Sequence, residues 1–176
     1  MIIRPMRLED VPGVARVHAR TWQTTYRGII PDDYLAAIQE EEWQQRWLPA
    51  FQQPQPDRFA YVAESEENGE IAGFVRGGPT HYPDLPYSGE LYAIYILQTY
   101  QGRGLGRRLV RALACDFQRI DLAEMLLWVF EANTSSRRFY EALGGQLVRT
   151  NSFEIGGVSL NECAYAWTDL GPLLLD

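Results

Sequence analysis

Cysteine and histidine are scarce in this 176-residue chain, which contains two of each. Cys115 and Cys163 cannot build a disulfide framework, and we expect both to be small core residues in a reducing compartment. So few thiols and imidazoles also lead us to expect no metal site. No apolar run approaches the roughly 20 residues of a membrane span, and the first residues lack the features of a signal peptide. The sequence therefore predicts a cytoplasmic protein without a membrane partner.

Basic residues are fewer than acidic ones, so the formal net charge is −7 and the isoelectric point is near 4.9. Nucleic-acid-binding proteins usually present a basic face, so we expect no nucleic-acid partner. The hydrophobic content of 46% is ordinary for a globular protein. With this length and no internal repeat, the chain is expected to form a single domain over residues 1–176.

Hydrophobic patterns and turn signals indicate an alternation of strands and helices. Seven segments are strand-like: Met1–Met6, Phe59–Glu64, Ile71–Arg76, Glu90–Leu97, Met125–Phe130, Gln146–Ile155 and Val158–Thr168. Helical spacing is found over Asp10–Trp22, around Leu35, over Glu40–Phe51, over Leu105–Ile120 and over Ser135–Leu143. The order predicts an α+β sandwich with a mixed sheet.

The stretch Gln101–Gly106, QGRGLG, lies between the strand-like segment Glu90–Leu97 and the helix that follows. A strand, a glycine turn and a helix together point free N–H groups and the positive end of the helix dipole at an anion. Glycines let the main chain approach that anion closely. Four arginines, at positions 103, 107, 108 and 111, add positive charge around the turn. The stretch therefore predicts an anion-binding site.

Two common anion-binding motifs do not match this turn. The dinucleotide fingerprint G-x-G-x-x-G fits Gly102 and Gly104, but Arg107 stands at its last glycine. A P-loop would require Gly-Lys-Ser/Thr, which is missing. The stretch instead resembles the acetyl-CoA signature Gln/Arg-x-x-Gly-x-Gly/Ala of the GNAT acetyltransferase superfamily, through Gln101, Gly104 and Gly106.

Further matches extend this resemblance over essentially the whole chain. Ser136–Gly144, SRRFYEALG, is similar to the family segment A-x-x-F-Y-x-x-x-G, with Ser at the first position. Trp22–Pro31 resembles a bacterial subgroup with W-x-x-x-Y-x-G-x-x-P, which includes polyamine acetyltransferases. The resemblance implies the GNAT fold, with a mixed sheet of about seven strands and four or five helices, and acetyl-CoA as the cosubstrate.

The resemblance also implies which residues hold the cosubstrate. The N–H groups of Gly102–Gly106 would bind the pyrophosphate, and an open edge of strand Glu90–Leu97 would pair with the pantetheine arm. Asn133 stands where the family often places an asparagine near the cofactor. The implied cofactor-binding residues are Ile94, Tyr95, Ile96, Gln101, Gly102, Arg103, Gly104, Leu105, Gly106, Arg107, Asn133 and Ser136.

Two residues are candidates for proton transfer. By its place in the family motif, Tyr140 would be the general acid that protonates the leaving thiolate; from helix spacing alone it would be a residue that fills the helix face. Glu90 is a candidate base, acting directly or through water, and the alternative is a solvated carboxylate at the start of its strand.

The histidines and tryptophans suggest no other chemistry. His18 lies on the apolar face of the first helix and is expected to pack there, whereas His81 lies in the proline-rich loop Gly77–Gly89. That loop either walls a substrate pocket or is a surface excursion. Neither histidine has a Ser or Cys partner motif, so we predict no hydrolase triad. The set Trp22, Trp43 and Trp47 is expected to be core or pocket wall.

Two classes of function stay open at this stage. The first is an N-acetyltransferase that moves an acetyl group from acetyl-CoA to a primary amine by direct attack on the thioester. The acceptor would be a small molecule, an amino acid, a polyamine or a peptide N-terminus. The second is a non-catalytic acyl-CoA sensor or interaction module with the same fold. The family resemblance also makes a homodimer an option that this sequence does not decide.

Overall fold

The structure is a computed structural model that describes residues 1–175. Its strands are β1 Ile2–Pro5, β2 Phe59–Glu64, β3 Ile71–Pro79, β4 Gly89–Ile96, β5 Met125–Phe130, β6 Gln146–Ile155 and β7 Val158–Trp167. Its α-helices are α1 Val11–Thr25, α2 Asp32–Ala36, α3 Glu40–Trp47, α4 Pro49–Gln52, α5 Leu105–Arg119 and α6 Thr134–Ala142. The seven predicted strands and their order are confirmed.

One predicted helix is wrong in its extent. We expected a single helix over Glu40–Phe51, and the structure divides it into α3 and α4. The break falls at Leu48-Pro49, where proline has no N–H for the preceding turn and its ring collides with that turn's carbonyl. Pro49 instead takes the first position of α4, where its missing N–H costs nothing.

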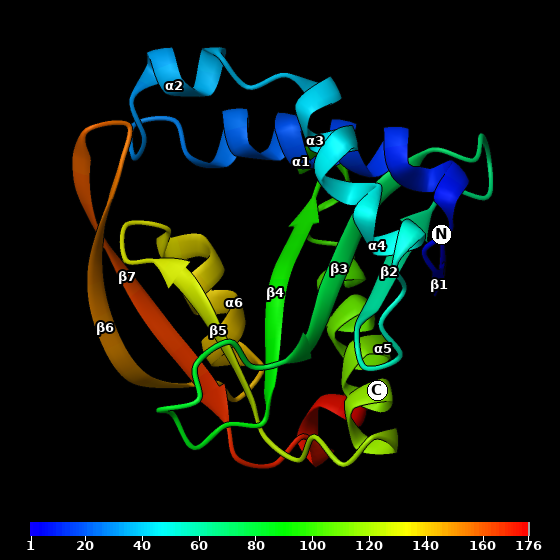
Figure 1. The fold of residues 1–176 in the computed structure, drawn as a ribbon, viewed down its shortest axis with the longest axis vertical. Helices are drawn as coiled ribbons and strands as arrows, with labels where there is room; N and C mark the ends of the chain where they lie inside the picture. The colour runs from blue at the N-terminus through cyan, green and yellow to red at the C-terminus, as the bar shows by residue number, and fades with distance from the viewer. Residues whose placement is uncertain (176) are drawn as a thin grey trace.

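All seven strands form one mixed sheet in the order β1-β2-β3-β4-β5-β7-β6. Its neighbours are antiparallel except at the centre, where β4 and β5 run parallel. That pair matches only Gly89 with Met125 and Glu90 with Leu126 before the two strands diverge (Figure 1). The rest of β4, Leu91–Ile96, is therefore unpaired along the edge that faces β5.

An irregularity in β4 coincides with this divergence. Arg76 of β3 pairs with Ala93 of β4, whereas the next residue of β3, Gly77, pairs with Leu91. Tyr92 is therefore an extra residue, as in a β-bulge, which bends a strand and increases its twist. The bulge lies where β4 leaves β5, so the opening of the sheet has a local structural cause.

Helices cover both faces of the sheet. On one face, α5 buries Leu109, Leu113 and Phe117 completely in the largest apolar cluster of the described residues. On the other face, Val14 of α1 and Trp47 of α3 pack with Phe74 of β3. These clusters hold β3 and β4 rigidly between two helical layers (Figure 1).

Glycine in the sheet allows α5 to approach closely. A Cβ atom added to Gly77 would lie 2.6 Å from the Glu90 carbonyl oxygen and 2.7 Å from a methyl carbon of Leu113. A Cβ atom on Gly89 would lie 2.7 Å from the ring of Phe117. The helix that carries the glycine turn is thereby seated directly on β3 and β4.

The two cysteines behave differently from each other. Cys163 is buried in β7, as predicted, but the core placement of Cys115 is wrong because its side chain is exposed. The buried stripe of α5 consists of Leu109, Leu113 and Phe117, and position 115 falls about half a turn away from it.

Within residues 1–175, no helix has both the length and the apolar character required to cross a bilayer.

Candidate active site

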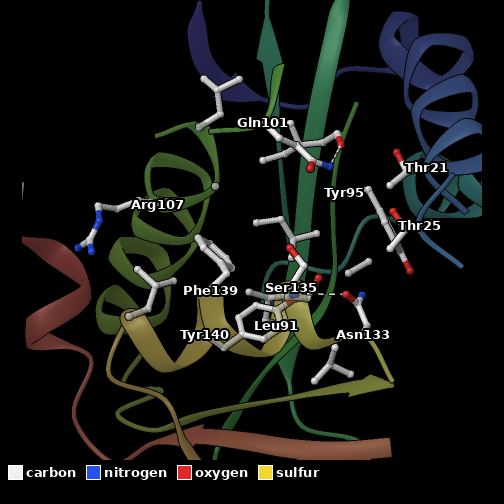
Figure 2. A pocket seen from close by; sticks show the side chains of 18 of the residues that line it. Thr21, Thr25, Leu91, Tyr95, Gln101, Arg107, Asn133, Ser135, Phe139 and Tyr140 are labelled. Carbon is white, nitrogen blue, oxygen red and sulfur yellow. Dashed lines mark hydrogen bonds between the residues drawn. The ribbon is translucent and has the colours of Figure 1, made fainter. Parts of the chain in front are cut away.

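A cavity of about 470 Å³ occupies the opening between β4 and β5. Its walls come from β4, β5, α1, α6 and the turn that begins α5 (Figure 2). Nearly all residues predicted to bind the cofactor line it: Ile94, Tyr95, Ile96, Gln101, Gly102, Gly104, Leu105, Gly106, Arg107, Asn133 and Ser136. The structure thus brings together residues that lie up to 42 positions apart in the sequence.

The glycine turn forms one end of this cavity. Gly102 and Gly104 have φ angles of 71° and 76°, in the left-handed region that favours glycine. The first backbone bond of α5 runs from Arg108 N–H to the Gly104 carbonyl. Among residues 1–175, the N–H groups of residues 102–107 have no hydrogen-bond partner. Those of residues 105–107 belong to the first turn of α5, where the helix dipole favours an anion.

Gly106 has a different role from Gly104. A Cβ atom on Gly104 would meet nothing within 4 Å, so the requirement there is backbone conformation. A Cβ atom on Gly106 would lie 2.8 Å from the Phe139 ring, so this glycine lets α5 approach α6. Both features are needed to keep the first turn of α5 open to the cavity.

The unpaired edge of β4 forms a second wall. The side chain of Gln101 donates to the Ile96 carbonyl at 2.9 Å, which ties the glycine turn to the end of β4. The Tyr95 hydroxyl accepts from the Trp22 indole N–H at 3.0 Å, and the Tyr95 ring stacks on His18 at 4.6 Å. The strand edge is therefore fixed against α1 on one side and against the glycine turn on the other.

The start of α6 forms a third wall. Asn133 caps this helix, because its side-chain oxygen accepts from the Ser136 N–H at 3.2 Å. The resemblance assigned Asn133 to the cofactor. The structure shows that Asn133 lines the cavity and also caps α6.

His18, expected on the apolar face of α1, is indeed buried, with 8% of its surface exposed.

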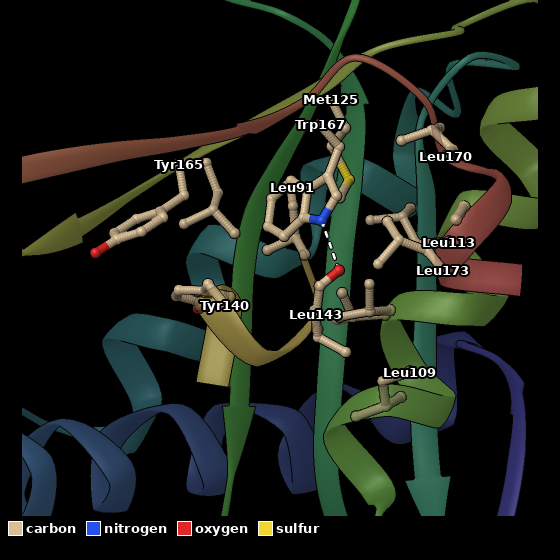
Figure 3. Close-up of a cluster of buried hydrophobic side chains, with 14 of the residues drawn as sticks. Leu91, Leu109, Leu113, Met125, Tyr140, Leu143, Tyr165, Trp167, Leu170 and Leu173 are labelled. Atoms are coloured by element: carbon tan, nitrogen blue, oxygen red, sulfur yellow. Dashed lines mark hydrogen bonds between the residues drawn. The ribbon is translucent and has the colours of Figure 1, made fainter. Parts of the chain in front are cut away.

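Tyr140 is almost completely buried and still lines the cavity, with 7% of its surface exposed. Burial, together with nearby Tyr95, holds the pKa of the Tyr140 phenol well above its usual value. The phenol therefore keeps its proton at neutral pH. The Trp167 indole N–H donates to the Leu143 carbonyl at 2.9 Å, and the Trp167 ring contacts Tyr140 edge-on. Trp167 thus ties β7 to the end of α6, the helix that carries Tyr140 (Figure 3).

Two predicted site residues lie outside the cavity lining. The Arg103 guanidinium sits over the ring of Tyr100 at 5.6 Å. Glu90 is buried at the base of β4, where its carboxylate accepts from the His81 backbone N–H at 2.9 Å. The same carboxylate oxygen lies 2.9 Å from the ring nitrogen Nδ1 of His81. Glu90 is thus neither a solvated strand-end carboxylate nor a direct part of the cavity wall.

Among the lining residues that were not predicted as site residues are Thr21, Thr25, Tyr26, Tyr92 and Trp128. The first two lie four positions apart on α1, a spacing that places both on one helix face. Thr21 and Thr25 stand beside Tyr95 in Figure 2. Helical spacing was the available signal, but only the fold shows that this face of α1 meets the opening of the sheet.

These features define a class of protein. A set of free N–H groups, an unpaired strand edge and a buried phenol share one cavity, which fits an elongated acyl donor with a phosphate at one end. The sequence model described as the acetyltransferase (GNAT) family matches residues 22–145. The uncharacterized N-acetyltransferase YuaI of Bacillus subtilis is 37% identical over 171 residues, which are 97% of this chain and 95% of YuaI. The chain belongs to the GNAT acetyltransferase family.

Solved structures show the same fold. A ribosomal-protein-alanine N-acetyltransferase from Brucella melitensis matches with a TM-score of 0.73 and 19% identity, over 95% of this chain and 99% of that one. The PaiA N-acetyltransferase of Thermoplasma acidophilum, determined with coenzyme A, matches with a TM-score of 0.69 and 19% identity, over 92% and 96%. The predicted GNAT fold, the enzyme class of N-acetyltransferase and acetyl-CoA as the cosubstrate are confirmed.

Proposed function

We propose that this protein transfers the acetyl group of acetyl-CoA to a primary amine by direct attack of the amine on the thioester. The observation that carries the proposal is the shared cavity, which is lined by residues 102 and 104–107 with their free N–H groups, by the unpaired edge Leu91–Ile96 and by Tyr140. The single domain expected over residues 1–176 would supply every group that this reaction needs.

The cosubstrate would bind along two walls. The N–H groups of Gly102–Arg107 would hold the pyrophosphate, with Arg107 beside it, because both the free donors and the helix dipole favour an anion there. The amides of the pantetheine arm would pair with Ile94–Ile96 as an added strand. Arg103 lies outside the lining, so a role for it would be limited to the mouth of the site.

Each proton in this reaction would have a donor and an acceptor. The ammonium group of the acceptor loses one proton to a base, and the amine nitrogen forms a bond to the thioester carbon. The carbon–sulfur bond then breaks, the thiolate takes the Tyr140 proton, and the tyrosinate recovers the second proton from the new amide nitrogen. Glu90 lies outside the lining, so it would take part in this proton transfer only through an intermediate group and not by direct contact with the amine.

The residue types that line the cavity favour some acceptor amines over others. Tyr26, Tyr92 and Trp128 give the cavity an aromatic character, and Thr21 and Thr25 add hydroxyl groups. Arg107, at the phosphate end, is the charged side chain among the described lining residues. A second ammonium group of a polyamine would find no counter-charge in that lining. This favours an acceptor with one amine and an apolar or aromatic body, such as an amino acid derivative or a peptide N-terminus.

Release of the free thiol from acetyl-CoA across a panel of amines tests the proposal. We expect release with at least one monoamine, at a rate that depends on amine concentration. The chain contains no lysine, so acetylation of its own lysine side chains cannot contribute to the signal. Tight binding of acetyl-CoA without release on any amine would instead favour a non-catalytic acyl-CoA sensor.

A further inference from the structure

Glu90 and His81 form a tightly defined pair at the base of β4. One carboxylate oxygen of Glu90 is 2.9 Å from both the backbone nitrogen and the ring nitrogen Nδ1 of His81. The Glu90 side chain is 10% exposed, whereas that of His81 is 53% exposed. The Glu90 carboxylate is thus already hydrogen-bonded and shielded from solvent. The His81 imidazole is the member of the pair that solvent and a substrate can reach.

The pair stands next to the acceptor part of the cavity. The His81 ring packs on Tyr92 at 4.6 Å, and the ring of Tyr82 packs on Trp128 at 5.3 Å. Tyr92 and Trp128 line the cavity from opposite sides of its opening, on β4 and β5. The loop over residues 80–88 therefore bridges the two strands at the end away from the glycine turn.

The loop holds His81 in a defined position. The Thr80 N–H donates to the Ser88 carbonyl at 3.0 Å, and the Tyr82 N–H donates to the Thr80 hydroxyl at 3.1 Å. The Tyr92 hydroxyl donates to the Pro79 carbonyl at 2.5 Å. These bonds fix the loop on both sides of His81, so the imidazole is presented from a structured segment.

This geometry selects one tautomer of the ring. A carboxylate accepts hydrogen bonds only, so neutral His81 must carry its proton on Nδ1, which leaves the lone pair of Nε2 free. Within residues 1–175, Nε2 has no hydrogen-bond partner. The two tyrosines beside the pair interact with further charged groups: Tyr82 with Asp84 and Glu162, and Tyr92 with Arg58, Arg76 and Asp57.

We propose that His81 is the general base of the acetyl transfer and that Glu90 is its positioning residue. This inference rests on the proposed function. Nε2 takes one proton from the acceptor's ammonium group, directly or through one water, and the Glu90 carboxylate stabilises the imidazolium that forms. After the carbon–sulfur bond breaks and Tyr140 has protonated the thiolate, His81 returns its proton to solvent.

Removing the imidazole should remove the base. We expect His81→Ala to lower kcat/KM for the best amine by about 100-fold or more, the usual contribution of a general base, while the Kd for acetyl-CoA stays within twofold. Added imidazole should restore part of the rate. As a matched control, Asp84→Asn alters an exposed charge of the same loop and should change the rate less than twofold. A rate for His81→Ala within threefold of the wild-type protein would overturn the proposal.

A double-mutant cycle separates the two possible roles of Glu90. If Glu90 acts through His81, Glu90→Gln should slow the wild-type protein about 10-fold but have little further effect on His81→Ala. If Glu90 is itself the base, Glu90→Gln should be the more damaging change, and its effect should persist without the imidazole. That second pattern contradicts the assignment.

A readout without any substrate keeps this inference distinct from the proposed function. Long-range nitrogen–proton NMR correlations of His81 at alkaline pH should show the ring proton on Nδ1, and Glu90→Ala should release this preference. A proton on Nε2 in the wild-type protein would rule out His81 as the general base positioned by Glu90, even if amine acetylation is observed. Absence of turnover on every amine, with the proton on Nδ1, would refute the proposed function while the geometry of the pair stands.

Discussion

Tyr140 has two proposed roles, core side chain and proton donor, and its environment is compatible with both. Its ring lies within 6.5 Å of Phe139, Tyr165 and Trp167, which is the packing expected of a core side chain. Yet its hydroxyl has no hydrogen-bond partner among residues 1–175, and the side chain lines the cavity. A buried phenol that keeps its proton and has no internal acceptor is suited to donate to a thiolate.

Replacing Tyr140 with Phe should therefore separate binding from chemistry. The ring packing is retained, so the Tm and the Kd for acetyl-CoA should change little, whereas kcat should fall by about 100-fold or more because the proton donor is lost. Rates of thiol release at saturating cosubstrate measure this effect. Tyr34→Phe, at an exposed position away from the cavity, is the control. An unchanged kcat would remove Tyr140 from the mechanism.

The two glycines of the signature should fail in different ways. Gly104→Ala places a Cβ at a φ of 76°, which costs about 1–2 kcal/mol and distorts the turn; we expect the Kd for acetyl-CoA to rise about 10-fold. Gly106→Ala creates a contact with Phe139 instead. The added change Phe139→Leu should recover binding for Gly106→Ala but not for Gly104→Ala. Calorimetric titration measures both, and equal recovery would contradict the distinction.

At this scale the sequence predicted the residues that line the glycine-turn end of the cavity better than those that line the opposite end. The glycine turn and the strand before it are local features, so a motif of six residues locates them. The contact between Glu90 and His81 depends on how a loop of nine residues folds back on β4, which local patterns do not report. Thr21 and Trp128 likewise meet in the cavity only because β5 diverges from β4.

At the scale of elements, α5 couples the core to the glycine turn. Leu113→Ala removes a completely buried side chain between this helix and the sheet, and should lower the free energy of unfolding by about 2–5 kcal/mol. Cys115→Ser, on the exposed face of the same helix, should change it by less than about 0.5 kcal/mol. Urea denaturation followed by circular dichroism measures both. Similar losses for the two variants would contradict the described face of α5.

The elements also show where sequence patterns stop being informative. Hydrophobic period and turn residues were sufficient for the strands, because each strand pattern is local. The break at Pro49 was missed because apolar spacing continues through Leu48 and Phe51 although the helix does not. The bulge at Tyr92 was not visible either, since it is a property of the pairing between β3 and β4.

At the scale of the whole molecule, stability should depend on pH through His18. Burial, assisted by Arg46, lowers the pKa of His18 to about 3. An unfolded chain binds this proton near pH 6.5, whereas the folded protein does not, so acid favours the unfolded state. The free energy of unfolding should therefore fall by up to about 1.4 kcal/mol per pH unit as the pH drops below 6.5.

Comparison with a variant isolates this contribution. His18 stacks on Trp43 at 3.6 Å, and its ring nitrogen Nδ1 is buried without a partner, so a phenyl ring is a reasonable replacement. The stability of His18→Phe, measured by urea denaturation between pH 4.5 and 7.5, should lack the loss that the wild-type protein shows below pH 6.5. Parallel curves for the two proteins would contradict the assignment of a neutral, buried imidazole.

A crystal structure with bound coenzyme A tests most directly whether the opening between β4 and β5 is an acetyl-transfer site. We expect the pyrophosphate within hydrogen-bond distance of the N–H groups of residues 102–107 and the pantetheine amides paired with Leu91–Ile96. We also expect the thiol near the Tyr140 hydroxyl, with the cavity bounded by Tyr92 and Trp128 on the acceptor side. Coenzyme A bound elsewhere, or a thiol remote from Tyr140, would contradict it.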